Sequence, residues 1–309
     1  MSREKVKVVF IAGSSYSGST MLGLVLGSDD AAFFSGEAKQ YMRRRDAKQH
    51  QTPGHYFCTC GERYEECPFW RSVHARYGSE RNLNPSPGFS WSNLRLVIHA
   101  LIPFERRNDR PTAEHARLLE TIRDVARADD SDIVYVVDSS KSVRSLDALA
   151  GASNIDLHVI HLIRDGFAVA SSFKSRGWNA FYGMVSWGML NVFLARYLRR
   201  NGIRNVRVDY GSLCLATAGE IERINAFLGF SLKPEQLTRR VRENVYHVFA
   251  GNKDVRGLSE KFPGIRFRAD RKQLNAVERL FAALLLAPLN RWFGIMSPVA
   301  PLATDAERG

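Results

Sequence analysis

The stretch VKVVFIAGSSYSGSTMLGLVLG, residues 6–27, decides the fold of this 309-residue chain. Its first part, Val6–Ala12, has the length and the Val/Ile content of a buried strand. Small residues follow, and an apolar segment that opens near Ser19 has the composition of a helix. Backbone N–H groups and Ser/Thr hydroxyls at the start of such a helix bind anions. The stretch therefore predicts an anion site between a buried strand and a helix.

The loop inside this stretch matches a known phosphate-binding spacing with one substitution. Gly13-x4-Gly18-Ser19-Thr20 has the spacing of the phosphate loop of nucleoside triphosphatases, but Ser19 stands where that motif requires lysine. That lysine is the usual partner of a γ-phosphate. Its replacement favours an anionic nucleotide other than a triphosphate.

Further apolar runs and helical segments alternate along the chain. The expected strands are Val6–Ala12, Ile133–Val137, Leu157–Ile163 and Val206–Val208. The apolar faces with helical spacing are Trp187, Leu190, Leu194 and Leu198, and Leu118, Ile122 and Val125 after a predicted cap at Thr112. Strands separated by helices imply crossover connections, so we predict an α/β fold with three layers and a central parallel sheet.

Residues 43–109 interrupt this alternation with His, Cys, Pro and Asn. We interpret them as an insertion near the substrate, and we expect residues 272–309 to form a C-terminal helical tail. The prediction is a single domain over residues 1–309.

The chain is basic, with 44 Lys and Arg against 32 Asp and Glu, a formal charge of +12. The excess favours anionic ligands or surfaces. Nucleic acid is one such partner, but the basic residues are scattered and their runs are short, so we expect none.

The N-terminus lacks a long apolar region with a small-residue cleavage site, and we expect a cytoplasmic protein. The most lipid-like segment, residues 281–302, is interrupted by prolines and polar residues, so it is not expected to span a membrane. Peripheral membrane contact is an alternative to a packed helix there, through Leu284, Leu285, Leu286, Trp292 and Phe293.

Three of the four cysteines, Cys58, Cys60 and Cys67, lie close together, and His55 precedes them. Because a reducing cytosol disfavours structural disulfides, this set is a candidate for tetrahedral zinc binding. Reduced or redox-active thiols in a surface insertion are the alternative.

A second phosphate element is indicated at residues 161–177, HLIRDGFAVASSFKSRG. Arg164 follows a buried strand, at the edge of the sheet where open α/β folds bind ligands. Ser172 lies about two helical turns further on, where both side chains could share one oxyanion. A salt-bridged turn is the alternative interpretation.

Taken together, these elements resemble the sulfotransferases that use 3′-phosphoadenosine 5′-phosphosulfate (PAPS). The resemblance covers most of the chain. Its motifs are the loop Ser14–Met21, the run Ile163–Ser172 with Arg176, Arg207–Tyr210, Phe227–Phe230, His247–Arg256 and the segment CTCGERYEECPFW. It implies that Ser15, Tyr16, Ser17, Gly18, Ser19 and Thr20 hold the 5′-phosphosulfate, that Arg164, Ser172, Arg176 and Arg256 bind at the 3′-phosphate end, and that Asn252, in the C-terminal element, also binds the cofactor. Solvated arginines and a structural turn at Asn252 are the alternatives for the last three.

The chain departs from the family at Tyr16, where related loops carry Lys or Arg. Lys141 matches a family lysine near the phosphosulfate and is the candidate cation, with a surface lysine at a helix start as the alternative. Glu37 matches the family's general base, with a role in the following helix as the alternative, and Asp138 is a second candidate base. We expect Tyr210 to pack beneath the nucleotide and Trp187 to lie in the core.

The resemblance implies sulfuryl transfer from PAPS to a hydroxyl or amine of a carbohydrate, lipid-linked or small-molecule acceptor. The product nucleotide is 3′-phosphoadenosine 5′-phosphate (PAP), and no metal is required. A phosphate-loop kinase or nucleotidase, and a nucleotide-binding protein without chemistry, are the alternatives. Ser19 argues against the kinase, because the γ-phosphate would lose its main cation.

Overall fold

One parallel sheet organises the computed structural model, which describes residues 4–43, 57–77, 110–248, 262, 264–265 and 274–295. In these residues the sheet has five strands in the order β2-β3-β1-β4-β5, all parallel. Their bounds are β1 Val6–Ala12, β2 Ala32–Gly36, β3 Tyr135–Asp138, β4 Ile155–Ile163 and β5 Asn205–Asp209. The predicted α/β class and parallel sheet are confirmed.

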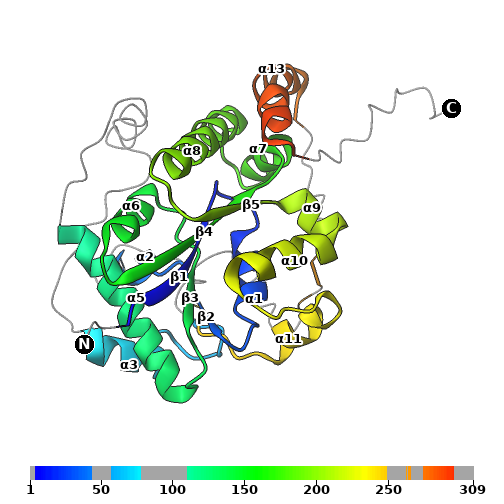
Figure 1. The fold of residues 1–309 in the computed structure, drawn as a ribbon. Helices are drawn as coiled ribbons and strands as arrows, with labels where there is room; N and C mark the ends of the chain where they lie inside the picture. Colours follow the sequence, from blue (N-terminus) through cyan, green and yellow to red (C-terminus); the bar gives the residue numbers. More distant parts are fainter. Residues whose placement is uncertain are drawn as a thin grey trace.

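Helices cover both faces of this sheet (Figure 1). One face carries α3 (Pro68–Tyr77), α5 (Arg110–Asp129), α6 (Val143–Gly151) and α8 (Ala180–Arg200), and the other carries α1 (Ser19–Leu26), α9 (Tyr210–Leu215), α10 (Thr217–Leu228) and α11 (Leu237–Glu243). The remaining named elements are α2 (Lys39–Arg43), α7 (Gly166–Ser175), the short 3-10 helix η3 (Pro234–Gln236) and α13 (Ala276–Phe293). The three-layer prediction is confirmed.

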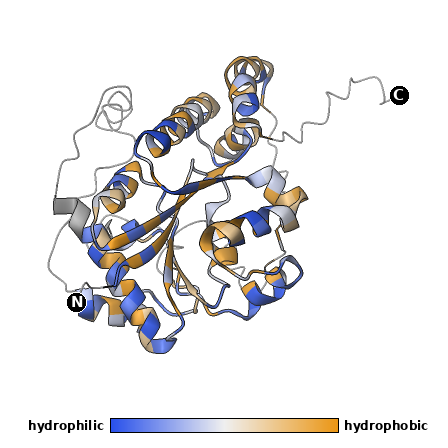
Figure 2. Cartoon of the chain, in the orientation of Figure 1, coloured by the Kyte–Doolittle hydropathy of each residue, from blue (hydrophilic) through white to orange (hydrophobic). Residues whose placement is uncertain are grey.

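The central strand β1 shows why both faces must be covered. Val6, Val8 and Phe10 point into the core on the α5 side, and Val9 and Ile11 point into the core on the α1 side. Alternation of side chains across a strand places apolar groups on both faces, as a fully buried parallel strand requires. Figure 2 shows the same pattern, with hydrophobic residues concentrated along the strands and on the inner helix faces.

The strand and helix predictions can be compared with the structure element by element. Val6–Ala12 is β1 itself, and the other three expected strands match β3, β4 and β5 with small shifts at their ends. Strand β2 is a short additional strand that the sequence interpretation does not include. Helix α5 begins at Arg110, so the prediction of Thr112 as its cap is wrong.

Helix α13 packs with α7 and α8 in a third apolar cluster that includes Trp187, which is fully buried as expected. Two of the side chains proposed for membrane contact, Leu286 and Phe293, are buried in this cluster, so that part of the prediction is wrong; Leu284 and Trp292 are exposed. Among the described residues, no helix has the length and apolar character needed to cross a bilayer.

The carboxyl ends of the strands bring distant parts of the chain to one edge of the sheet. The phosphate loop follows β1, Glu37 follows β2, Lys141 lies shortly after β3, Arg164 follows β4 and Tyr210 follows β5. Ligands of open α/β sheets bind at this edge. The fold therefore collects most of the predicted site residues in one region.

Candidate functional site

The phosphate loop turns into α1 at Gly18. This residue is the N-cap of α1 with φ 94°, in the left-handed region that favours glycine. A Cβ at Gly18 would lie 2.3 Å from the Tyr210 ring, so the loop packs directly on that ring. The first α1 hydrogen bond runs from the Leu22 N–H to the Gly18 carbonyl at 3.1 Å, and the first-turn amides point toward the loop. The loop therefore has the backbone geometry of an anion site.

Buried hydroxyls around the loop provide a second indication. The Oγ atoms of Ser14, Ser17 and Ser139 are buried and have no hydrogen-bond partner within the described chain. Leaving a buried hydroxyl without a partner costs about 1–3 kcal/mol, so such groups are commonly satisfied by a ligand or water. Ser14 and Ser17 lie in the loop, and Ser139 follows β3 at the same edge. These donors fit an oxyanion.

Lys141 supplies the cation that the loop sequence lacks. Its Nζ donates to Ser19 Oγ at 3.0 Å and to Glu37 Oε1 at 2.8 Å. Both side chains of the ion pair are largely buried, at 17% and 14% exposure. Ser19 occupies the lysine position of the nucleoside triphosphatase motif, and Lys141 reaches that position from the end of β3. The structure thus joins both predicted catalytic residues to the phosphate loop.

The Lys141 ammonium also sets the charge state of Glu37. Burial alone would raise the pKa of Glu37, but the nearby ammonium groups of Lys141 and Lys39 outweigh it and hold that pKa below its ordinary value. Gln40 Nε2 donates a further hydrogen bond to Glu37 Oε2 at 3.1 Å. Glu37 is therefore a carboxylate at neutral pH, as a general base must be.

Asp138, the second candidate base, is engaged with its neighbours on both oxygens. Its Oδ2 lies 2.9 Å from His115 Nε2, and its Oδ1 accepts from the N–H groups of Ala38 at 3.3 Å and Ser140 at 2.9 Å. Asp138 is fully buried. These contacts favour a positioning role, because they fix the backbone next to Glu37 and next to Lys141.

Two non-glycine residues in the described chain have positive φ, Tyr16 at 63° and Lys141 at 55°. Such conformations cost about 1–3 kcal/mol and cluster at functional sites. The Tyr16 ring packs edge-on against Phe173 at 4.9 Å, and the Arg176 guanidinium lies 4.8 Å from it. Tyr16 therefore contributes its backbone to the loop while its side chain packs against α7.

Arg164 contacts the phosphate loop directly. Its Nη1 donates to the Tyr16 carbonyl at 2.9 Å, and its guanidinium lies 5.0 Å from the Tyr210 ring centre. Arg164 is 9% exposed. The two predicted anion elements are thus adjacent, and Arg164 fixes the loop whether or not it also contacts a phosphate.

The remaining predicted nucleotide contacts lie in the loop, in the first turn of α1, and on α7 or at its end. Ser172 Oγ donates to the Ala168 carbonyl of its own helix at 2.8 Å, and Arg176 is exposed at the end of α7. Ser15 is exposed in the loop, and Thr20 is buried in the first turn of α1. Asn252 and Arg256 lie outside the described residues. The roles of all these side chains in nucleotide binding remain predictions.

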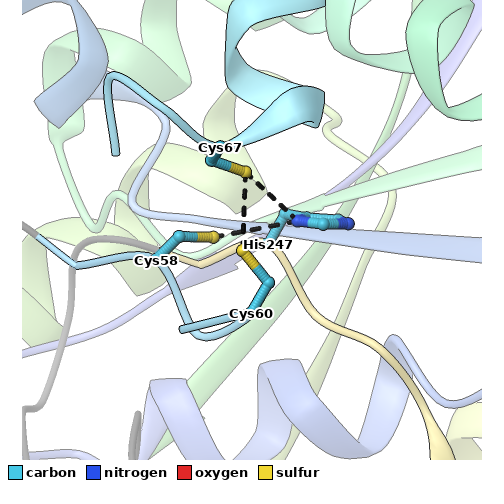
Figure 3. Close-up of side chains that lie close together, drawn as sticks. All are labelled: Cys58, Cys60, Cys67 and His247. Atoms are coloured by element: carbon cyan, nitrogen blue, oxygen red, sulfur yellow. Dashed lines mark hydrogen bonds between the residues drawn. The ribbon is translucent and has the colours of Figure 1, made fainter. Parts of the chain in front are cut away.

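Three of the cysteines gather around a histidine that the zinc prediction did not include (Figure 3). Cys58, Cys60 and Cys67 lie beside His247, whose imidazole comes from the segment after α11. His55, the predicted fourth ligand, lies outside the described residues. The grouping of the three cysteines is confirmed, and the histidine that the structure brings to them is His247.

His115 and His247 are the residues that sequence reasoning missed or assigned elsewhere. His115 lies near the start of α5, in its second turn, with no motif around it. The only feature of the sequence that could have identified His115 is a polar residue on an otherwise apolar helix face, and such residues are common. His247 lies 180 residues after Cys67, so no local spacing connects them.

No family model matches the chain, and no curated protein matches it. Similar solved structures are sulfotransferases. The sulfotransferase domain of the olefin synthase of Synechococcus PCC 7002 is 19% identical, with a TM-score of 0.45 over 96% of this chain and 98% of that one. The sulfotransferase domain of the curacin biosynthetic pathway is 16% identical, with a TM-score of 0.43 over 92% and 98%. Sulfotransferase STF9 of Mycobacterium avium is 12% identical, with a TM-score of 0.46 over 96% and 78%.

Proposed function

We propose that this protein is a PAPS-dependent sulfotransferase acting on a hydroxyl or amine acceptor. The observation that carries the proposal is Lys141, whose ammonium bridges Ser19 of the phosphate loop and the carboxylate of Glu37. A cation, an anion-binding loop and a buried base thereby meet at one point. Sulfuryl transfer needs these groups together, because a compact anionic group leaves a phosphate as an acceptor loses a proton.

The loop and its hydroxyls fit the donor end of this reaction. PAPS would supply an activated sulfuryl group on a 5′-phosphate. The first-turn amides of α1 and the Oγ atoms of Ser14 and Ser17 would bind that end, and Lys141 would balance the negative charge that develops on the phosphate oxygen. Arg164 would hold the loop in shape through the Tyr16 carbonyl.

Glu37 would act on the acceptor. Its carboxylate is held unprotonated by Lys141 and Lys39, which keep its pKa low, so it can take the proton from an acceptor hydroxyl or amine. The acceptor class follows from this role alone, since a base beside the donor loop requires a nucleophile that carries a proton. Carbohydrates, lipid-linked alcohols and small-molecule hydroxyls or amines all satisfy it.

A kinase using the same loop is the competing function. Lys141 supplies a cation at the position of the missing lysine, which a γ-phosphate would also accept. Phosphoryl transfer on such a loop also uses a carboxylate, besides a loop hydroxyl, to hold Mg²⁺. Glu37 and Asp138, at the same edge of the sheet, are engaged by Lys141 and by His115. The sulfuryl donor is therefore favoured.

Ligand-induced thermal stabilisation separates the two. At a hundredfold excess over its dissociation constant a ligand stabilises the folded state by about 2.7 kcal/mol. PAP should raise the melting temperature, and ATP with Mg²⁺ should not. The reverse order would favour the kinase, and indifference to both nucleotides would contradict the proposal.

Substitution of Glu37, the proposed base, tests turnover. Glu37→Gln should keep PAP binding while abolishing the mass gain of one SO₃ unit on acceptors incubated with PAPS. The matched control is Glu235→Gln. This substitution changes an exposed carboxyl that is far from Glu37 in the sequence, and it should retain activity. Full turnover in Glu37→Gln would remove Glu37 as the base.

A further inference from the structure

The three cysteines and His247 are arranged around a common centre. Cys60 Sγ lies 3.7 Å from Cys67 Sγ, and His247 Nδ1 lies 3.4 Å from Cys67 Sγ and 3.8 Å from Cys58 Sγ. All four ligand atoms lie within 4.8 Å of one another. Figure 3 shows the sulfur atoms and one ring nitrogen pointing toward one another.

These separations match the edges of a zinc tetrahedron. Zn–S bonds of about 2.3 Å and Zn–N bonds of about 2.0–2.1 Å place tetrahedral sulfurs about 3.8 Å apart and a sulfur and a nitrogen about 3.6 Å apart. A disulfide would need its sulfurs at about 2.05 Å. The separation of Cys60 and Cys67 is far longer, and none of the four cysteines forms a disulfide in the structure. The geometry fits a metal better than a disulfide.

Each cysteine is held in place by its own backbone. Cys58 and Cys60 lie in a tight turn closed by hydrogen bonds from the Cys58 N–H to the Glu62 carbonyl at 2.8 Å and from the Gly61 N–H to the Cys58 carbonyl at 3.0 Å. Cys67 directly precedes α3, where the Arg71 N–H donates to its carbonyl at 2.9 Å. Ligands on rigid backbone lose little entropy when they bind a metal.

The histidine is equally constrained, by groups from the cysteine segment. The Trp70 indole N–H donates to the His247 carbonyl at 2.8 Å, and the Phe69 ring lies parallel to the imidazole at 5.1 Å. Next to it, Thr59 and Val248 exchange hydrogen bonds at 2.9 and 3.0 Å. Such outer contacts fix the orientation of a metal-binding imidazole.

We propose that Cys58, Cys60, Cys67 and His247 form a structural Zn²⁺ site. Four protein ligands close the coordination sphere, which is the arrangement of structural sites and leaves no position for a substrate. The site joins residues 57–77 to the segment around His247, far away in the sequence. The proposal does not depend on sulfuryl transfer.

The position of the site indicates what the metal does. His247 precedes residues 249–261, which include Asn252 and Arg256, the two side chains that the resemblance assigns to the nucleotide. Zinc at His247 would anchor the start of that run to the cysteine segment. Metal binding to such a site stabilises the folded state directly, so removal of the metal destabilises the protein.

The test is the metal content of the full-length chain, purified without a histidine tag or chelator and under reducing conditions. We expect one equivalent of zinc by elemental analysis. Replacement with Co²⁺ should give the visible bands of tetrahedral cobalt with thiolate charge transfer. Protein that contains no zinc, and that takes up neither Zn²⁺ nor Co²⁺, would overturn the proposal.

Variants then test the ligand set. Cys67→Ser should lose zinc, whereas Cys214→Ser, the matched control at the fourth cysteine, should keep it. His247→Ala should bind zinc at least tenfold more weakly, and His247→Cys should restore binding with four thiolates. His55→Ala should retain zinc. Loss of zinc in His55→Ala with retention in His247→Ala would overturn this ligand set.

Discussion

Gly36 and Asp138 face each other where the parallel strands β2 and β3 end. Just beyond this pairing the chain places Glu37 on one side and Lys141 on the other, and Asp138 accepts hydrogen bonds from the backbone next to each. The Ser139 N–H also donates to the Gly36 carbonyl at 2.8 Å. The ion pair between Glu37 and Lys141 is therefore a consequence of strand register.

Removal of the Lys141 charge should change the pH dependence of the reaction. Lys141 lowers the pKa of Glu37 against the opposing effect of burial. In Lys141→Met the pKa of Glu37 should rise, so the acidic limb of kcat/KM should move to higher pH. Lys233→Met, an exposed substitution, is the control. An unmoved acidic limb would show that Glu37 is not the titrating base.

Asp138→Asn should disturb both catalytic side chains through their backbone. The substitution weakens the contact with His115 and removes a charged acceptor that two buried N–H groups use. We expect a loss of about 1.5–3 kcal/mol in the free energy of unfolding, measured with urea, because hydrogen bonds to a charged acceptor become bonds to a neutral one, and we expect a fall in kcat. Asp129→Asn, at the exposed end of α5, should leave both unchanged. A variant as stable and active as the parent would rule out the positioning role.

Gly18→Ala should destabilise the protein more than an ordinary glycine substitution at positive φ. The new Cβ would lie 2.3 Å from the Tyr210 ring, whereas a Cβ at Gly229, with φ 78°, would meet nothing within 4 Å among the described residues. Gly229→Ala should therefore lower the free energy of unfolding only by the cost of a left-handed backbone at alanine, about 1–2 kcal/mol. Gly18→Ala should lower the free energy of unfolding by more than this and abolish PAP binding. The double variant Gly18→Ala/Tyr210→Ala should recover part of the stability, and equal costs at the two glycines would contradict the close packing.

Arg164→Ala should weaken PAP binding, because the guanidinium holds the Tyr16 carbonyl of the phosphate loop. Loss of a hydrogen bond from a charged donor costs about 1.5–3 kcal/mol, which corresponds to a tenfold or greater rise in Kd. Isothermal titration calorimetry provides the measurement, and Arg199→Ala on the exposed side of α8 is the control. Unchanged affinity would restrict Arg164 to a role in folding.

His161 should make the fold sensitive to acid. Burial lowers its pKa to about 4, against an ordinary value near 6.5. Between these values the unfolded chain binds a proton that the folded chain does not, so stability falls as the pH drops from about 6.5 toward 4, by about 3 kcal/mol in total. His161→Asn should flatten this part of the stability curve, and His74→Asn at an exposed position should not. If the stability of His161→Asn fell with pH as steeply as that of the parent protein, His161 would not be the source of the acid sensitivity.

The sequence determined the parts of this protein that depend on local patterns. The strand–loop–helix at residues 6–26 follows from apolar run length and small residues, and the parallel sheet follows from alternating strands and helices. The candidate pair Glu37 and Lys141 follows from motif resemblance at two separate places, without any indication that they touch. The short strand β2 escapes prediction because its sequence, AFFSG, lacks the Val and Ile residues that mark the other strands.

Only the tertiary structure decided which distant residues meet. Local spacing cannot connect Lys141 to Ser19, His115 to Asp138 or His247 to Cys67, because each pair is joined by strand order, helix packing or a returning loop. Side chains separated by many residues come together only when apolar burial on both faces of the sheet fixes the register of its strands. For that reason the sequence predicted which chemical groups are present, and the fold decided how they are combined.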